Sequence, residues 1–225
     1  MATAKSPKTL VIDIGGTNIK LFATGQRELT KIPSGPTLTA NKMVRVVKDA
    51  VRTWEYDRIT IGYPAPVING RPLREPHNLG GGWVGFNFTK AFGCPVKVIN
   101  DAAMQALGSY EGGRMLFLGL GTGLGNCLIY DKVIAPMELG HLPYKKGRTF
   151  EDYVGQAGMK RMGRRKWQSS VFDVVQRLRD ALLPDYVVLG GGNVKKLDEM
   201  PPGCRPGDND NAFIGGARLW QPDHA

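Results

Sequence analysis

Short apolar runs alternate with longer amphipathic segments along the chain. The apolar runs are bounded by Gly, Asn and Asp, as is typical of buried strands, and they lie at residues 10–14, 19–23, 59–62, 96–99, 115–119, 127–130 and 187–189. Apolar residues at helical spacing predict helices over residues 43–54, 102–110 and 171–182, the last stopped by Pro184. Strands that alternate with helices predict an α/β protein.

Two glycine-rich turns each separate a pair of these predicted strands. One covers residues 15–18 and the other residues 119–125. The repeated pattern predicts two related halves, each opened by a hairpin whose turn lets an anion approach the backbone. Neither turn matches a Walker A loop, and the second lacks the spacing and the following helix of a dinucleotide fingerprint.

Composition narrows the class of protein. Glycine contributes 30 of 225 residues, roughly twice the usual share of about 7%. With 42% hydrophobic and 22% charged residues, a disordered chain is excluded. The cysteines Cys94, Cys127 and Cys204 form no CxxC pair, so we expect a reduced, cytoplasmic protein. No apolar segment approaches the ~18 residues of a membrane span, and residues 1–9 lack the apolar stretch of a secretory signal.

Positive charge is concentrated in one part of the chain. The formal net charge is +10, and residues 141–196 hold twelve Lys or Arg against five Asp or Glu. The densest group is Arg161, Arg164, Arg165 and Lys166. Such a field favours a long polyanion, but composition alone supports an ordinary solvated basic surface equally well. Nucleic acid is disfavoured as a partner because no recognised motif is present and aromatic residues are not interleaved with the basic ones.

Six motifs resemble those of the ROK sugar kinases, and most closely those of the polyphosphate glucokinase branch. They occur in the family's order over roughly residues 10–218 and read Asp13-Ile-Gly-Gly-Thr17-Asn-Ile-Lys20, Gly62-Tyr-Pro64-Ala-Pro66-Val, Asn100-Asp101, Leu120-Gly-Thr-Gly-Leu-Gly125, Glu138-Leu-Gly-His141 and Gly190-Gly-Gly192. The resemblance implies an actin-like ATPase (ribonuclease H-like) α/β fold with two lobes around a cleft. Residues 1–101 would form a small lobe, completed by a C-terminal helix over 211–225, and residues 102–210 a larger donor-binding lobe.

The same resemblance implies a kinase that transfers a phosphoryl group from polyphosphate or ATP to the 6-hydroxyl of glucose. Asp101 would be the general base, although by itself it is equally an acid at a helix N-terminus. The sugar would contact Asn78, Asn100, Asp101, Glu138, His141 and Glu151. The phosphoryl donor would contact Asp13, Gly15, Gly16, Thr17, Lys20, Gly121, Thr122, Gly123, Gly190, Gly191 and Gly192. Asp13 would also lie beside Mg²⁺, which takes few protein carboxylates.

The chain departs from the family pattern at three places, one of which is a short segment between His141 and Gly190. Ala65 stands where the family usually has a second glycine, and residues 142–151, directly after His141, contain no cysteine, so we expect no structural zinc. Alternatives are an ATP-dependent kinase of another hexose or N-acetylhexosamine, and a non-catalytic sugar-binding regulator. The regulator is disfavoured because only nine residues precede the first predicted strand, too few for a helix-turn-helix domain. The expected partners are a hexose, a polyanionic donor and a second copy of the chain, but no membrane.

Overall fold

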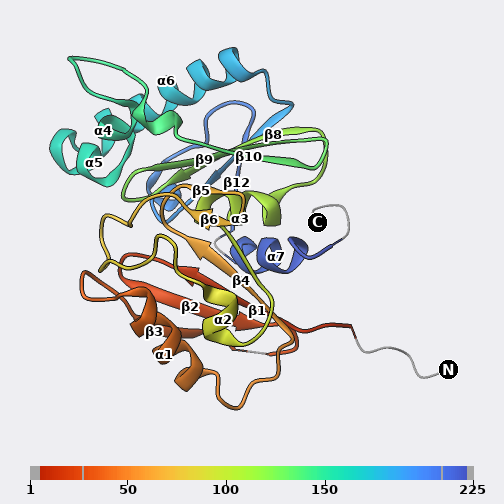
Figure 1. Ribbon diagram of the computed structural model, residues 1–225. Coiled ribbons are helices and arrows are strands. Elements are labelled where there is room, and N and C mark those ends of the chain that lie inside the picture. The colour runs from red at the N-terminus through yellow and green to blue at the C-terminus, as the bar shows by residue number, and fades with distance from the viewer. Residues whose placement is uncertain (1–5, 27, 209, 222–225) are drawn as a thin grey trace. The chain divides into compact units, whose positions relative to one another are not determined.

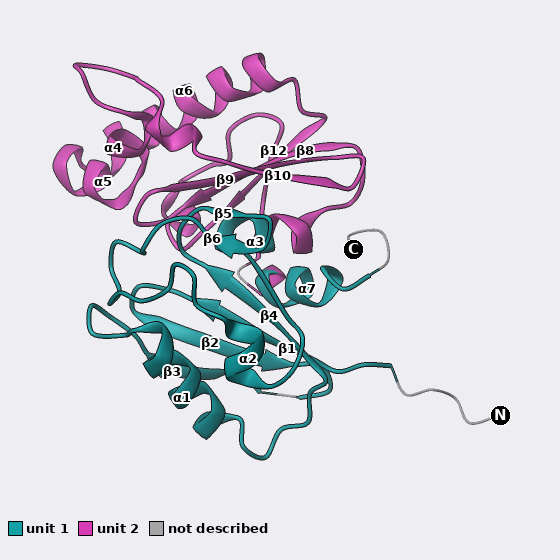
Figure 2. Cartoon of the chain, in the orientation of Figure 1, with its two compact units in different colours: residues 1–104, 212–225 teal, residues 105–211 magenta. Residues whose placement is uncertain are grey.

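The computed structural model describes residues 6–26, 28–208 and 210–221. The chain forms two compact units of similar length, one made of residues 1–104 with 212–225 and the other of residues 105–211 (Figure 2). The first boundary falls three residues beyond the expected one after Asp101, inside helix α3 (Asp101–Ser109). The assignment of a donor to one lobe stays a prediction.

A five-stranded sheet in the order β3-β2-β1-β4-β7 forms the centre of unit 1. Its strands are β1 (Thr9–Ile14), β2 (Asn18–Ala23), β3 (Thr30–Pro33), β4 (Arg58–Tyr63) and β7 (Val96–Asn100). β2 is antiparallel to both β1 and β3, while β1, β4 and β7 are parallel. A separate two-stranded sheet pairs β5 (Val67–Ile68) with β6 (Arg71–Pro72).

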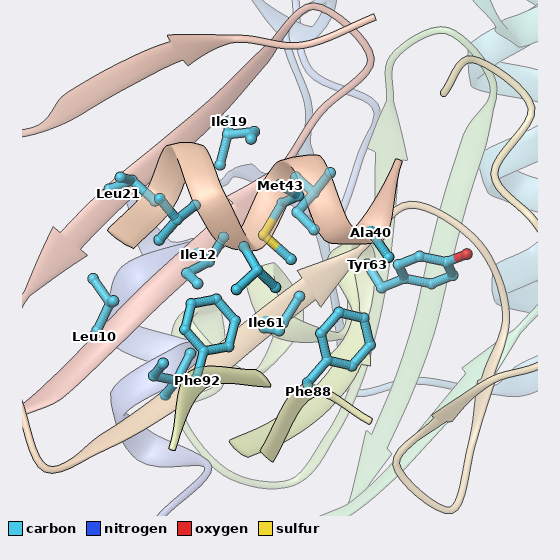
Figure 3. Close-up of a cluster of buried hydrophobic side chains, with 14 of the residues drawn as sticks. Leu10, Ile12, Ile19, Leu21, Ala40, Met43, Ile61, Tyr63, Phe88 and Phe92 are labelled. Atoms are coloured by element: carbon cyan, nitrogen blue, oxygen red, sulfur yellow. The ribbon is translucent and has the colours of Figure 1, made fainter. Parts of the chain in front are cut away.

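Helices cover both faces of this sheet (Figure 1). On one face, α1 (Ala40–Ala50) and α2 (Phe88–Phe92) place Met43 and Phe88 against the alternating inward residues Ile12 and Ile61, as Figure 3 shows. On the other face lies α7 (Asn211–Arg218), where the ring of Phe213 is 5.3 Å from that of Phe22.

The contact between α7 and the sheet is unusually close. A Cβ at Gly216 would overlap the side chain of Val11, so only glycine fits there. The buried Thr60 hydroxyl donates to the Gly216 carbonyl (2.7 Å) and accepts from the Trp220 indole N–H (2.9 Å). The described C-terminal residues therefore belong to the core of unit 1. Residues 222–225 of the expected helix lie outside the described residues.

Unit 2 repeats the sheet plan of unit 1, with the order β10-β9-β8-β11-β12. Its strands are β8 (Arg114–Leu120), β9 (Leu124–Tyr130), β10 (Val133–Met137), β11 (Tyr186–Gly190) and β12 (Cys204–Pro206). Again the second strand, β9, is antiparallel to both of its neighbours, β8 and β10, while β8, β11 and β12 are parallel. One sheet face is covered by helices α4 (Phe150–Val154), α5 (Gln156–Met162) and α6 (Arg164–Leu182), and two short 3₁₀ turns are η1 (Leu139–His141) and η2 (Val194–Lys196).

The α/β class and the repeated hairpin predicted from the sequence are confirmed. Several boundaries differ. α1 ends at Ala50, so Trp54 lies beyond the helix predicted to include it, and α6 begins at Arg164, seven residues earlier than predicted. Within the described part of the chain, no helix combines the length and apolar character needed to cross a bilayer.

Candidate functional site

Strand register brings the unit 1 candidates together at the end of the sheet where the parallel strands have their carboxyl ends. In the ladder, Asp13 on β1 lies level with Gly62 on β4, and Gly62 lies level with Ile99 on β7. Adjacent strands are about 4.8 Å apart, so Asp13 and Asn100 lie near the same sheet edge, two strand spacings apart. This is the carboxyl end of three parallel strands, where α/β proteins characteristically bind ligands.

Asp101 is the first residue of α3, and Asn100 caps that helix. The Asn100 Oδ1 accepts from the Ala103 N–H (3.1 Å), while its Nδ2 donates to the carbonyl of Ala65 (3.3 Å). Asp101 is half-buried, and its Oδ1 accepts from the N–H of Ala102 (2.8 Å). The side-chain amide of Asn100 still has one N–H and one oxygen lone pair for a ligand.

Gly62 allows the helix to start this close to the sheet. A Cβ at Gly62 would overlap the Met104 side chain and lie 3.7 Å from the Cα of Asp101. Ala65 packs at the edge of the unit 1 core, and its carbonyl holds the Asn100 amide. The loop after β4 therefore orients the residue next to Asp101 through backbone atoms, which an alanine at position 65 supplies as well as a glycine.

The β1–β2 turn lies beside the same edge. The Gly15 N–H donates to the Asn18 carbonyl (2.9 Å), and the Ser34 hydroxyl donates to the Gly15 carbonyl (2.6 Å). A Cβ at Gly16 would lie 3.4 Å from that of Asn78, so the predicted sugar residue Asn78 is next to the turn. Ser34 was not predicted, because no motif links it to the turn.

Asn78 belongs to a loop that two anchors organise. The carboxylate of Glu75 accepts from the backbone N–H of Trp83 (3.1 Å), and the N–H of Gly80 donates to the Leu38 carbonyl (3.0 Å). The buried Trp83 fixes the end of the loop in the core. Glu75 is another residue that sequence reasoning missed.

Asp13 and Lys20 form a cross-strand ion pair. The Lys20 Nζ is 3.1 Å from the Asp13 Oδ2, and the aspartate side chain is only 8% exposed. No group of three His, Cys, Asp or Glu side chains within the described ranges could hold a metal ion. Mg²⁺ in kinases usually takes one or two carboxylates and completes its coordination with donor phosphates and water, so the lone carboxylate of Asp13 fits that ion.

The glycine candidates of unit 2 meet at the corresponding edge of the second sheet. Gly119 lies level with Gly125 on one side and with Gly190 on the other. The turn of residues 121–123 is held by Asn193, whose N–H donates to the Leu120 carbonyl (3.0 Å) and whose Nδ2 donates to the Gly121 carbonyl (2.9 Å). Asn193 is buried and was not predicted.

The three glycines after β11 have different environments. A Cβ at Gly190 would overlap the ring of Phe117, and Gly191 has φ +86° against the Leu120 backbone. By contrast, a Cβ at Gly192 would meet nothing within 4 Å. Gly191 and Gly192 line a groove of about 430 Å³ together with Val194, Lys195, Pro206, Gly207 and Asp208. The groove therefore offers an anion backbone groups and one lysine ammonium, with the carboxylate of Asp208 as an opposing charge.

Glu138, His141 and Glu151 also come together in unit 2. The Glu151 Oε2 accepts from the N–H of Leu124 (3.0 Å), and a Cβ at Gly140 would lie 3.4 Å from the same oxygen. The Glu138 and His141 side chains are 53% and 61% exposed, with 3.9 Å between carboxylate and imidazole. Exposed hydrogen-bonding groups of this kind suit a polyol.

Buried Asn126 holds the backbone under these residues. Its Oδ1 accepts from the N–H of Leu139 (3.2 Å), and its Nδ2 donates to the Leu124 carbonyl (2.9 Å). One amide thus links η1 to the start of β9. The candidates consequently form two groups: Asp13, Lys20, Asn78, Asn100 and Asp101 with the first glycine turn in unit 1, and the remaining candidates in unit 2.

Comparisons with known proteins agree with the motifs. The family model described as "ROK family" matches residues 9–158. A polyphosphate glucokinase of Mycobacterium tuberculosis is 28% identical over 216 residues, which cover 85% of this chain and 80% of that protein.

Two solved structures show the same fold. An inorganic polyphosphate/ATP-glucomannokinase from Arthrobacter sp. strain KM is 23% identical with a TM-score of 0.78, covering 94% of this chain and 97% of that one. A ROK family glucokinase from Streptomyces griseus, in complex with glucose and AMPPNP, is 17% identical with a TM-score of 0.76 and coverages of 94% and 98%. The predicted actin-like ATPase fold and the family resemblance are confirmed.

Proposed function

Because the chain belongs to the ROK family, we propose that it is a sugar kinase that transfers a phosphoryl group from polyphosphate or ATP to the 6-hydroxyl of glucose. The names of the M. tuberculosis and Arthrobacter relatives support this choice. The observation that carries it is the sheet edge of unit 1, where Asp101 opens a helix beside Asn100 and near the Asp13 turn.

Asp101 would act as the general base. Its carboxylate would accept the proton of the sugar hydroxyl as that oxygen attacks the transferred phosphoryl group. Asn100 would hold a neighbouring hydroxyl with the donor and acceptor that its helix cap leaves available. Glu138, His141 and Glu151 would bind other hydroxyls of the sugar, so an analogue lacking one would leave a polar group unpaired.

The donor would bind through backbone groups of the glycine turns. Gly15 and Gly16 in unit 1, and Gly121 and Gly192 in unit 2, let phosphate oxygens approach the chain closely. Asp13 would hold Mg²⁺, which neutralises charge on the donor phosphates when bound. Lys20, already 3.1 Å from that carboxylate, would add a positive charge at the same place.

The four residues of the basic cluster, Arg161, Arg164, Arg165 and Lys166, differ in their surroundings. Arg164 pairs with Asp198 and donates to the Lys196 carbonyl (2.6 Å), while Arg161 donates to the Asp152 carbonyl (2.6 Å). The other two side chains, Arg165 and Lys166, are exposed and make no hydrogen bond or ion pair with any described residue. We therefore assign the polyphosphate contact mainly to Arg165 and Lys166.

A coupled assay of a hexose panel, each sugar with ATP and with long polyphosphate, tests the function. The expected result is glucose 6-phosphate formation with at least one donor. Preference for another hexose would favour the alternative kinase. Glucose binding without turnover by either donor would favour the sugar-binding regulator and overturn the proposal.

The donor assignment has a charge-matched test. Changing Arg165 and Lys166 to glutamine should raise the KM for long polyphosphate severalfold and weaken its salt dependence, with little effect on ATP. The control changes Arg45 and Arg52 of unit 1, two exposed arginines, to glutamine. Equal effects of both double variants would mean that only net charge matters, and equal effects on both donors would remove these residues from polyphosphate binding.

A further inference from the structure

A closed loop connects Glu138 and His141 to Glu151, the three predicted sugar-binding residues of unit 2. Residues 142–149 leave η1, which ends at His141, and return to α4, which carries Glu151. The loop pairs with itself: the Tyr144 N–H donates to the Arg148 carbonyl (2.7 Å), and the Phe150 N–H donates to the Leu142 carbonyl (3.0 Å). Its stem is therefore a small hairpin with a fixed shape.

One side chain of the loop is tied to a different helix. The Tyr144 hydroxyl donates to the Asp173 Oδ2 on α6 (2.5 Å) and accepts from the Lys145 Nζ (2.6 Å). The same carboxylate oxygen is 3.2 Å from the Lys145 Nζ and 3.1 Å from the Arg177 Nε. The Tyr144 hydroxyl, followed by Arg177 and Lys145, lowers the pKa of Asp173 below its ordinary value, so the carboxylate is charged at neutral pH.

The Tyr144 ring extends this link to the helix that carries Glu151. Its centroid is 5.4 Å from that of Phe150 and 4.9 Å, edge-on, from that of Tyr153. These two aromatic residues flank Glu151 on α4. The cluster thus joins α6, the loop and α4 through one tyrosine.

The exposed candidates have little else to hold them. Glu138 and His141 are more than half exposed, and their mutual distance of 3.9 Å is too long for a strong hydrogen bond. Asn126 fixes η1 from its amino end. Its carboxyl end depends on the loop that Tyr144 anchors.

We propose that the Tyr144–Asp173 pair is a positioning device that sets the sugar-binding geometry of Glu138, His141 and Glu151 from outside the site. This inference rests on the proposed function. Neither Tyr144 nor Asp173 contacts the sugar in this scheme. They act by fixing the loop that connects His141 to the helix carrying Glu151.

Two conservative variants test the pair. Tyr144→Phe keeps the ring stack and removes the hydroxyl, and Asp173→Asn keeps the shape and removes the charge. Each should raise the KM for glucose about fivefold, the scale of one ordinary hydrogen bond, while the KM for the donor changes less than twofold. The double variant should be no worse than either single one, because both remove the same link.

A matched control lies on the same helix. Asp180 accepts from Gln176 (2.7 Å), an exposed contact on α6 that does not reach the loop. Asp180→Asn should leave the glucose KM unchanged. Variants of Tyr144 and Asp173 that behave like Asp180→Asn, or that change only the melting temperature or both KM values equally, would overturn the positioning role.

Calorimetric titration with glucose separates this inference from the proposed function. A wild type that binds glucose without phosphorylating it would refute the kinase, yet a weaker glucose Kd in both variants would still support the positioning pair. An unchanged Kd, or a wild type that binds no glucose, would refute it.

Discussion

Replacing Asp101 by asparagine should separate catalysis from folding. The carboxylate and the amide have nearly the same shape, and the asparagine Oδ1 can still accept from the N–H of Ala102, which lies 2.8 Å from the aspartate oxygen. The amide cannot take a proton from a sugar hydroxyl. The change therefore removes the proposed general base and keeps the local hydrogen bond.

The two expected magnitudes differ widely. A general base contributes about 100-fold to 10,000-fold in rate, which is roughly 2.7–5.5 kcal/mol of barrier. An acidic residue in the first turn of a helix stabilises it by about 0.3–1 kcal/mol through the helix dipole, and Asp101 is the first residue of α3. Asn100, which caps the same helix through the Ala103 N–H, is unchanged. The increase in the activation barrier should therefore be several times larger than the decrease in the free energy of unfolding.

Three measurements on Asp101→Asn check this reasoning. Glucose 6-phosphate formation gives kcat, calorimetric titration gives the Kd for glucose, and urea unfolding gives the free energy of unfolding. We expect kcat to fall at least 100-fold, with Kd within about threefold of wild type. Turnover near wild type would remove Asp101 from the mechanism, and a stability loss as large as the activity loss would make it a structural residue only.

Three further results are expected. Gly191→Ala should cost about 2 kcal/mol or more of unfolding free energy, because φ is +86° and the Leu120 backbone leaves no room, whereas Gly192→Ala should unfold like wild type and raise the donor KM. The pKa of Asp173 is lowered on folding, so its contribution to stability is present above about pH 4 and lost as pH falls below that value; Asp173→Asn should flatten this part of the stability curve. Elemental analysis should find no stoichiometric zinc, and zinc chelators should leave the melting temperature unchanged, since residues 142–151, directly after His141, contain no cysteine.

Each strand that the sequence predicted has at least two buried residues. All six residues of β1 are buried, so its apolar run is unbroken. β3 and β10 are edge strands with only partly buried and exposed residues, and they leave no such run. The start of α6 was missed for a similar reason, because its first turn is Arg-Arg-Lys and its first buried residue is Trp167.

Most candidate site residues were found through the family motifs, while the residues that support them were not. Ser34, Asn126 and Asn193 bond to backbone groups of distant segments, and a single polar residue carries no sequence signal of such a partner. One signal in the sequence could have located the start of α4. Thr149 and Asp152 form a capping box at the start of α4, the spacing that marks a helix start just before Glu151.

The number of basic residues in the sequence also does not show which of them can contact the phosphoryl donor. A count of basic residues treats every side chain as available to a polyanion. In the structure, the charge of Arg164 is compensated by Asp198, and one N–H of Arg161 already donates to a backbone carbonyl, so fewer of their donors are available to a phosphate. Arg165 and Lys166 keep their hydration and can exchange it for phosphate oxygens at less cost. A basic cluster therefore attracts a polyanion through all its charges, but contact with the polymer depends on the cations that the fold leaves uncompensated.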